Sequence, residues 1–248
     1  NFSGAILHNI DFNEAIIIQN AIYNYSSLDH SIFKEDVLDG LDFTGVTSMR
    51  NTNFESADLH GVIIDDASLS GANFSGANLH NMDFYKAQHL APANYRYTCL
   101  SGSNFSGKIL DLIDFTGVQN MINTNFENTS MSGAIMKEAN ISGAIFISSI
   151  LDHVDFSGTT IGTVDFSGAS MIQVNMCGQN LRDTILTNVT INDSNLIEVD
   201  ITNQSGLLGT SFNEANLSGA IVEGANLFGS TFISATLDHI DFSGTTIG

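Results

Sequence analysis

The sequence predicts an all-β fold in which the chain coils as one long solenoid. Two observations point to it: a bulky apolar residue returns at every fifth position, and this pattern runs from Phe2 to Ile247 of the 248 residues. A period of five fits neither the 3.6-residue turn of an amphipathic helix nor the two-residue alternation of an ordinary strand. Hydrophobic residues make up 43% of the chain, enough to pack rather than stay disordered. A repeating coil accounts for these features together.

The bulky residue, here called the centre of each unit, sets the register. The interval of 245 residues from Phe2 to Ile247 equals 48 steps of five plus five single-residue insertions, which gives 49 centres. A small or β-branched residue, such as Ala134 or Val154, stands two positions before most centres. Of the 17 Phe residues, 16 are centres and Phe228 is the exception. The insertions precede Ile18, Met49, Leu90, Met121 and Leu207.

The register predicts which residues face inward. We expect the centre and the small residue two positions before it to point into the coil, while the other three residues of each unit face solvent. If four units complete one coil, the chain makes about 12 coils and a rod roughly 58 Å long, at about 4.8 Å per coil. Outward residues one coil apart then form columns on the same face.

Two runs of the chain carry a family resemblance. Ala72-Asn73-Phe74-Ser75-Gly76-Ala77-Asn78-Leu79 and Ala215-Asn216-Leu217-Ser218-Gly219 resemble the A(D/N)Lxx signature of pentapeptide repeat proteins, and the resemblance covers the whole chain. It implies a right-handed quadrilateral β-helix. The inward and outward positions come from the periodicity itself, whereas the handedness and the square cross-section come from the resemblance.

Longer repeats lie above the short one. Residues 42–46 recur 72 positions on as residues 114–118, and residues 146–162 recur with three changes 86 positions on as residues 232–248. The second offset is an odd number of units, so we expect the ring-bearing centres to move to the other two walls. Because either pair of walls can then hold the aromatic centres, the pattern favours a coil with four nearly equivalent walls. We interpret the insertions as tolerated bulges at corners.

We predict one solenoid over residues 1–248. Both ends stop in the middle of a unit, and open solenoid ends expose core and unpaired edges. From this we expect a segment of a longer chain, with end-to-end self-association of the isolated rod. Light scattering over a range of concentrations tests that expectation.

The charge and the cysteines exclude several classes of function. The chain has 27 Asp and Glu against 7 Lys and Arg, a formal net charge of −20, so we expect no direct binding to nucleic acid or to an anionic membrane. No apolar run approaches the roughly 20 residues of a membrane span, and no signal peptide is visible. A cytoplasmic location and secretion by another route both stay open. Cys99 and Cys177 predict free thiols rather than a disulfide or a zinc site.

Several outward columns contain groups with chemical potential. Asp39, His60 and His80 fall one coil apart, and we interpret them as solvated neighbours rather than a metal site, because three ligands need converging geometry. His8, Asp29 and Arg50 predict a surface salt ladder of small energetic value. The pairs Asp29-His30, Asp152-His153 and Asp238-His239 look like acid–base dyads, but a filled solenoid has no pocket for catalysis.

Two other features concern the outer surface. Pro92 marks the least regular outer loop, and Tyr23-x-Tyr25 and Tyr95-x-Tyr97 alternate inward and outward. We assign no catalytic residue, no cofactor and no metal ligand.

The sequence leaves three functions open. The first is a non-catalytic structural scaffold or protein–protein interaction module, because a rigid rod offers long faces and no cleft. The family resemblance implies two others: an acidic mimic of DNA that binds DNA gyrase or topoisomerase, of the quinolone-resistance type, and a targeting or substrate-binding domain of a bacterial secreted effector. The net charge favours mimicry. Against it, the aspartates that directly precede centres scatter over three walls: Asp11, Asp42, Asp58, Asp83, Asp114, Asp155, Asp165, Asp200 and Asp241.

Overall fold

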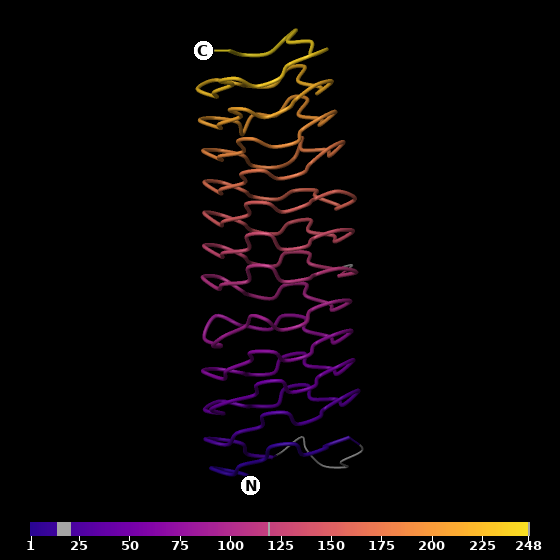
Figure 1. Cartoon of the computed structure of the whole chain (residues 1–248), viewed down its shortest axis with the longest axis vertical. Helices are drawn as coiled ribbons and strands as arrows, with labels where there is room; N and C mark the ends of the chain where they lie inside the picture. Colours follow the sequence, from indigo (N-terminus) through magenta and orange to yellow (C-terminus); the bar gives the residue numbers. More distant parts are fainter. Residues whose placement is uncertain (14–20, 119, 248) are drawn as a thin grey trace.

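The computed structural model describes residues 1–13, 21–118 and 120–247. They form a tall column of stacked coils whose N-terminal and C-terminal residues lie at opposite ends (Figure 1). Within these ranges there is no helix, hence none able to cross a membrane, and no strand longer than one bridging residue. The predicted all-β solenoid is confirmed at this level.

Isolated parallel β-bridges join each coil to the next. The bridging residue stands directly before a centre, except that Gln88 stands two residues before Leu90. Asn53, for example, pairs with Asn73, 20 residues further on, so four units complete one coil. Two backbone hydrogen bonds hold a typical side. The amide of Phe33 donates to the carbonyl of Asn53 in the next coil at 2.8 Å, and the amide of Ile32 donates to the carbonyl of Ile10 in the preceding coil at 2.9 Å.

A tight turn ends each side of the coil. In the unit centred on Leu217, the centre's carbonyl accepts a hydrogen bond from the amide of Ala220 at 2.9 Å, and Gly219 between them has φ of 71°. Positive φ recurs two positions after the centre in most described units, at Gly, Asn and other residues alike. This is the pattern of a type II turn, in which the third residue must be left-handed and Gly or Asn is favoured.

The Asp or Asn before the centre supports the same turn. Oδ1 of Asp165 accepts a hydrogen bond from the amide of Ser167 at 2.9 Å, and Oδ1 of Asn216 accepts one from the amide of Ser218 at 3.0 Å. A short side chain with an acceptor oxygen can bond the backbone two residues on. This local bond explains why Asp and Asn recur before the centre.

The interior is a packed column of centres and of the small residues before them. Phe33, Phe126 and Met131 are fully buried, and Ala139 and Val154 beside centres are buried as well, as the register predicts. Rings stack from coil to coil on two sides, with centroids 4.4–5.6 Å apart. One stack holds Phe12, Phe33, Phe54, Phe74, Tyr95 and Phe115, and another holds Phe84, Phe105, Phe126, Phe146 and Phe166.

The predicted change of walls is also present. Phe212 stacks on Phe232 at 5.0 Å. The bridges Ile150–Ser170, Ser170–Thr190, Thr190–Ser211 and Ser211–Thr231 place this pair in the column of Leu151, not in that of Phe146.

The insertions lengthen the coil without breaking the column. Bridges that cross them span 21 residues instead of 20: Ser27–Ser48, Asn73–Asn94, Cys99–Asn120 and Thr190–Ser211. The insertion predicted before Ile18 lies outside the described residues. Before Leu207, the side chain of the buried Gln204 bonds backbone groups beside the insertion. Its Nε2 donates to the carbonyls of Leu181 at 2.7 Å and Thr184 at 2.6 Å, and its Oε1 accepts from the amide of Gly206 at 2.8 Å.

Candidate interaction surface

His60 and His80 lie in the predicted column. Their rings stack with centroids 5.5 Å apart, and His60 Nδ1 donates to the backbone carbonyl of His80 at 3.1 Å. Oδ1 of Asp39 lies on the same face, 3.7 Å from the position that a Cβ of Gly61 would take. Across the described ranges no three His, Cys, Asp or Glu side chains gather in a way that would hold a metal ion.

The column of His8, Asp29 and Arg50 differs from the predicted surface ladder. Asp29 is buried, with 3% of its surface exposed, because its carboxylate turns under the next coil. There it accepts hydrogen bonds from Ser48 Oγ, from the Arg50 amide at 2.8 Å, and from Arg50 Nε at 3.0 Å and Nη2 at 2.6 Å. His8 takes no part and bonds Ser27 Oγ at 2.7 Å instead. The predicted salt contact of Asp29 with Arg50 is present, whereas the predicted surface exposure of Asp29 and the part of His8 in the ladder were wrong.

These bonds set the ionisation of Asp29. Burial raises the pKa of the carboxyl, but the hydrogen bonds from Arg50 and Ser48 outweigh burial and hold the pKa below its usual value. A buried carboxylate that accepts four hydrogen bonds, two of them from the guanidinium of Arg50, is part of a structural ion pair.

The Asp–His pairs do not form dyads in the described structure. Oδ1 of Asp152 accepts from Ser170 Oγ at 2.7 Å and from the Ile172 amide at 2.9 Å, so it bonds the next coil rather than His153. His153 sits at the left-handed turn position and is exposed. Asp29 and Asp152 therefore each tie two coils together.

The cysteines and tyrosines lie where the register puts them. Cys99 is partly buried and Cys177 exposed, and both are free thiols. Tyr95 is buried, whereas Tyr97 is 60% exposed. Tyr23 and Tyr25 show the same alternation, with Tyr25 75% exposed.

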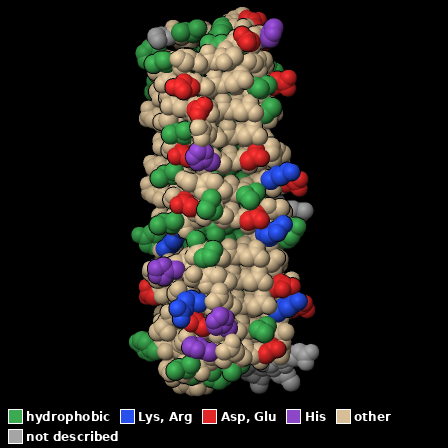
Figure 2. All heavy atoms as spheres, viewed as in Figure 1, with side chains coloured by type: hydrophobic (Ala, Val, Ile, Leu, Met, Phe, Trp, Pro, Cys, Tyr) green, Lys and Arg blue, Asp and Glu red, His purple; other side chains and the backbone are tan. Residues whose placement is uncertain are grey.

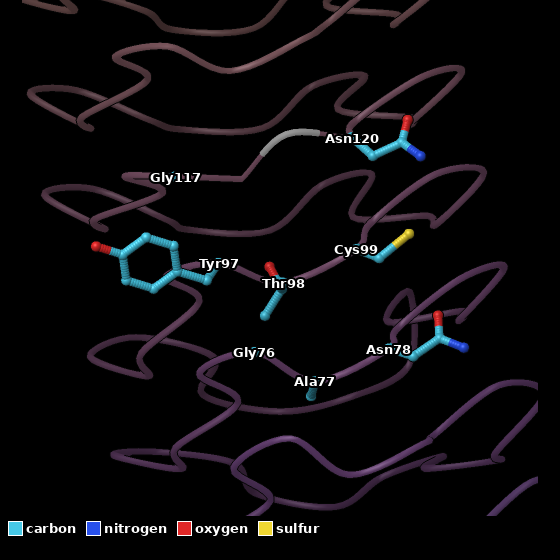
Figure 3. Close-up of a pocket in the computed structure, with 8 residues that line it drawn as sticks. All are labelled: Gly76, Ala77, Asn78, Tyr97, Thr98, Cys99, Gly117 and Asn120. Carbon is cyan, nitrogen blue, oxygen red and sulfur yellow. The ribbon is translucent and has the colours of Figure 1, made fainter.

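A hollow of about 440 Å³ lies beside Tyr97 and Cys99 (Figure 3). Its lining includes Asn78 below Cys99 and Asn120 above it, on the column of residues before centres, and Gly76 and Gly117 at the corner. The side-chain functional groups of this hollow are two amides, one thiol, one phenol and the Thr98 hydroxyl.

Two further hollows follow insertions on one side of the rod, here called the Met49 side, whose centres include Leu28, Met49, Leu69, Leu90 and Leu110. The first, of about 510 Å³, lies beside Arg50. The second, of about 370 Å³, lies beside Lys108. Between them Ala91 and Pro92 are joined by a cis peptide bond, and His89 has φ of 48°. Ala91, directly before Pro92, lines the second hollow, so the predicted irregular loop adjoins a hollow that the sequence did not show.

The acidic groups are spread over the rod. Figure 2 shows red side chains scattered across the visible face among uncharged ones, with basic and histidine side chains between them. Each of the nine aspartates that precede a centre accepts a hydrogen bond from the amide two residues on. These carboxylates therefore have a structural role in the turns.

Solved structures resemble the chain at low identity. HetL, a pentapeptide repeat protein involved in heterocyst differentiation regulation from the cyanobacterium Nostoc sp. strain PCC 7120, is 18% identical over 99% of this chain and 88% of its own, with a TM-score of 0.28. QnrB1, a plasmid-mediated fluoroquinolone resistance protein, is 17% identical over 88% of this chain and 91% of its own, with a TM-score of 0.34. Rfr23 from the cyanobacterium Cyanothece 51142 is 16% identical over 58% of this chain and 91% of its own, with a TM-score of 0.27.

No curated protein sequence matches the chain. Two family models do. One describes pentapeptide repeats in 8 copies and matches residues 37–76, 52–88, 98–133, 164–203 and 210–247, and another describes 9 copies and matches residues 126–171. The five-residue register, the inward centres and these matches agree, and the chain belongs to the pentapeptide repeat family.

Proposed function

We propose that the chain is a non-catalytic structural scaffold or protein–protein interaction module. The observation that carries the proposal is the filled interior: the centres and their preceding residues pack a continuous core, so in the described part of the chain the functional groups open to a partner lie on the outer walls. The Asp groups of those walls hold turns and neighbouring coils together. Long flat faces with shallow hollows suit contact with another protein.

The proposal includes the finer features of the rod. We expect a right-handed course of about 12 coils over residues 1–248, at about 4.8 Å per coil. The partner is one or more proteins.

Mimicry of DNA by the acidic surface is the second candidate, and the net charge of −20 supports it. It is weakened by the turn-capping role of the nine aspartates, because their positions follow the turns rather than a phosphate-like stripe. A DNA gyrase supercoiling assay separates the two. Inhibition at micromolar protein would favour mimicry, and unchanged supercoiling would leave the interaction module. A targeting domain of a secreted effector is a special case of the module.

Hydrogen–deuterium exchange of the full chain with a captured partner tests the module directly. We expect protection at outward positions that recur every 20 or 21 residues, since one wall presents such positions side by side. Protection scattered over all walls without this interval would contradict binding to a face.

A further inference from the structure

The two hollows of the Met49 side share His89 in their linings, and together they are here called the Arg50–Lys108 groove. His89 lines both of them, with Arg50, Ser68 and Ser70 on one part and Lys108 and Ile109 on the other. The insertions before Met49 and Leu90 fall on this same side. The groove therefore follows the rod axis across successive coils, from Arg50 to Lys108.

The groove is lined by basic side chains, whereas the rod as a whole is acidic. Its cationic groups are Arg50 at one end and Lys108 at the other, with the imidazole of His89 between them. None of the residues that line either hollow, all of them in the described part of the chain, carries a carboxylate. In a chain of net charge −20, such a face attracts groups that the other walls repel.

Lys108 has unused bonding capacity. Its ammonium donates to the carbonyl of Ala87 at 2.9 Å and lies 5.8 Å from the ring centroid of Tyr85. It forms no ion pair with any described carboxylate, whereas Lys34, Lys86, Arg96 and Arg182 do. Burial lowers the pKa of Lys108, against the charge of Asp83. An ammonium has three donors, so two remain for a bound acceptor.

The backbone adds further donors. The Lys108 ammonium bonds the carbonyl of Ala87, where a regular side would receive the amide of Ile109. The amides of Leu90 and Ile109 form no hydrogen bond with a described residue, although Leu90 is buried. An amide without a partner is costly in a buried residue such as Leu90. A ligand rich in acceptor atoms would satisfy them.

Arg50 is only partly occupied. Its Nε and Nη2 bond Asp29, its Nη1 bonds no described residue, and 59% of its side chain is exposed. Ser68 and Ser70 lie between Arg50 and His89, and neither hydroxyl bonds another described residue. The groove is thus lined with hydrogen-bond donors throughout its length.

The length of the groove fits a short extended segment. Three coil spacings of about 4.8 Å separate Arg50 from Lys108, roughly 14 Å in all. An extended peptide advances about 3.3 Å per residue and points alternate side chains to the same face, so residues i and i+4 present their side chains roughly 13 Å apart. A long nucleic acid would extend beyond the groove onto acidic walls.

We propose that the Arg50–Lys108 groove binds an extended acidic segment of a partner protein, with carboxylates at positions i and i+4 held by Lys108 and Arg50. The backbone carbonyls of the segment accept from the free amides, and the intervening polar side chain meets His89. This inference rests on the proposed interaction module and names the site and the partner's chemistry.

Fluorescence anisotropy of the full chain with a labelled peptide Gly-Ser-Glu-Ser-Thr-Ser-Glu-Ser-Gly tests the groove. We expect binding that weakens with salt. Lys108→Gln should raise Kd about tenfold, the loss of one charge-assisted hydrogen bond, while Lys108→Arg keeps it within about twofold. Lys137→Gln is the matched control, because Lys137 lies outside the groove and forms no ion pair with a described residue.

Four results would overturn the proposed groove. Two concern the peptide: equal affinity when Gln replaces both Glu, and equal affinity when the Glu residues stand at i and i+2. The other two are an equal loss of affinity in Lys137→Gln and Lys108→Gln, and tighter binding of a labelled single-stranded DNA than of the peptide. Circular dichroism checks that Lys108→Gln is folded. Exchange protection by a captured partner on another wall would sink the groove yet leave the proposed module standing, so the two failures are distinguishable.

Discussion

The ring of Tyr97 occupies the space into which a side chain at Gly117 would project. A Cβ on Gly117 would lie 2.3 Å from both Cδ1 and Cε1 of Tyr97. The same relation joins Asn81 to Gly102 and Asn123 to Gly143, where the Cβ would meet the amide oxygen at 2.2 Å. At each of these corners a larger side chain packs against the same corner of the next coil, where the residue is glycine.

Gly117→Ala tests this corner relation. Gly117 has φ of 73°, so alanine costs about 1 kcal/mol for its left-handed backbone, and displacement of the Tyr97 ring adds about 1 kcal/mol more. Gly107→Ala is the control, since Gly107 has φ of 69° and open space at its Cβ. Urea unfolding should show the larger loss for Gly117→Ala. Equal losses would mean that the ring moves freely.

Asp165→Ala should destabilise the rod by about 1 kcal/mol, because the amide of Ser167 loses its acceptor. Asp165→Asn keeps an acceptor oxygen and should stay within about 0.5 kcal/mol of the parent. Urea denaturation measures both. A large loss in Asp165→Asn would show that the charge itself matters, contrary to a capping role.

Gln204→Leu should cost about 2–3 kcal/mol, since the carbonyls of Leu181 and Thr184 and the amide of Gly206 lose a partner beside a buried side chain. Gln179→Leu is the matched control. Its side-chain amide donates only to the carbonyl of Phe156, and the residue is only partly buried, so the loss should be smaller. Thermal unfolding compares the loss of stability in the two variants. A larger loss in Gln179→Leu than in Gln204→Leu would contradict the role of Gln204 in bonding the backbone at the insertion.

Tyr95→Phe should stabilise the rod by about 1 kcal/mol. Tyr95 is fully buried in the ring stack, its hydroxyl has no hydrogen-bond partner, and burial raises its pKa. The reverse change, Phe105→Tyr, buries a hydroxyl in the neighbouring stack and should destabilise. Urea unfolding of both variants provides the check. Destabilisation by Tyr95→Phe would indicate a partner for the hydroxyl.

Asp29 should make stability depend on acid pH. Its folded pKa is depressed, so its contribution is full above the unfolded value of about 4 and is lost as pH falls through the folded pKa. Asp29→Asn should therefore be less stable than the parent at pH 7, with a difference that shrinks below about pH 4. Urea midpoints from pH 7 to pH 2.5 measure this. Asp39→Asn, at an exposed position, is the control.

The sequence predicted what depends on burial alone. Phe126 and Met131 face inward because a five-residue period leaves few other places for large apolar groups, and the alternation of Tyr95 and Tyr97 follows from the same register. The columns of outward residues also follow, as His60 and His80 show. These properties need only the period and the coil length.

The sequence could not predict how deeply each outward side chain is buried at the surface. Asp29 and Arg50 were predicted to share a column, but whether a carboxylate lies in solvent or turns under the next coil depends on its rotamer and on nearby donors such as Ser48. The groove beside Lys108 depends in the same way on how the backbone bends around an insertion. The Asp and Asn before each centre carried a signal for the turn caps, because such residues commonly bond the amide two positions on.

The position of the Phe212–Phe232 stack means that the second copy of residues 146–162 faces a different direction from the first. An odd number of units turns the copied surface onto the neighbouring side of the rod and moves it along the axis. One partner type could then dock twice on a single rod along two directions, and a bivalent partner would gain avidity only if its linker spans that corner. Each added unit therefore sets both the position of a repeated surface along the rod axis and the side of the rod that it faces.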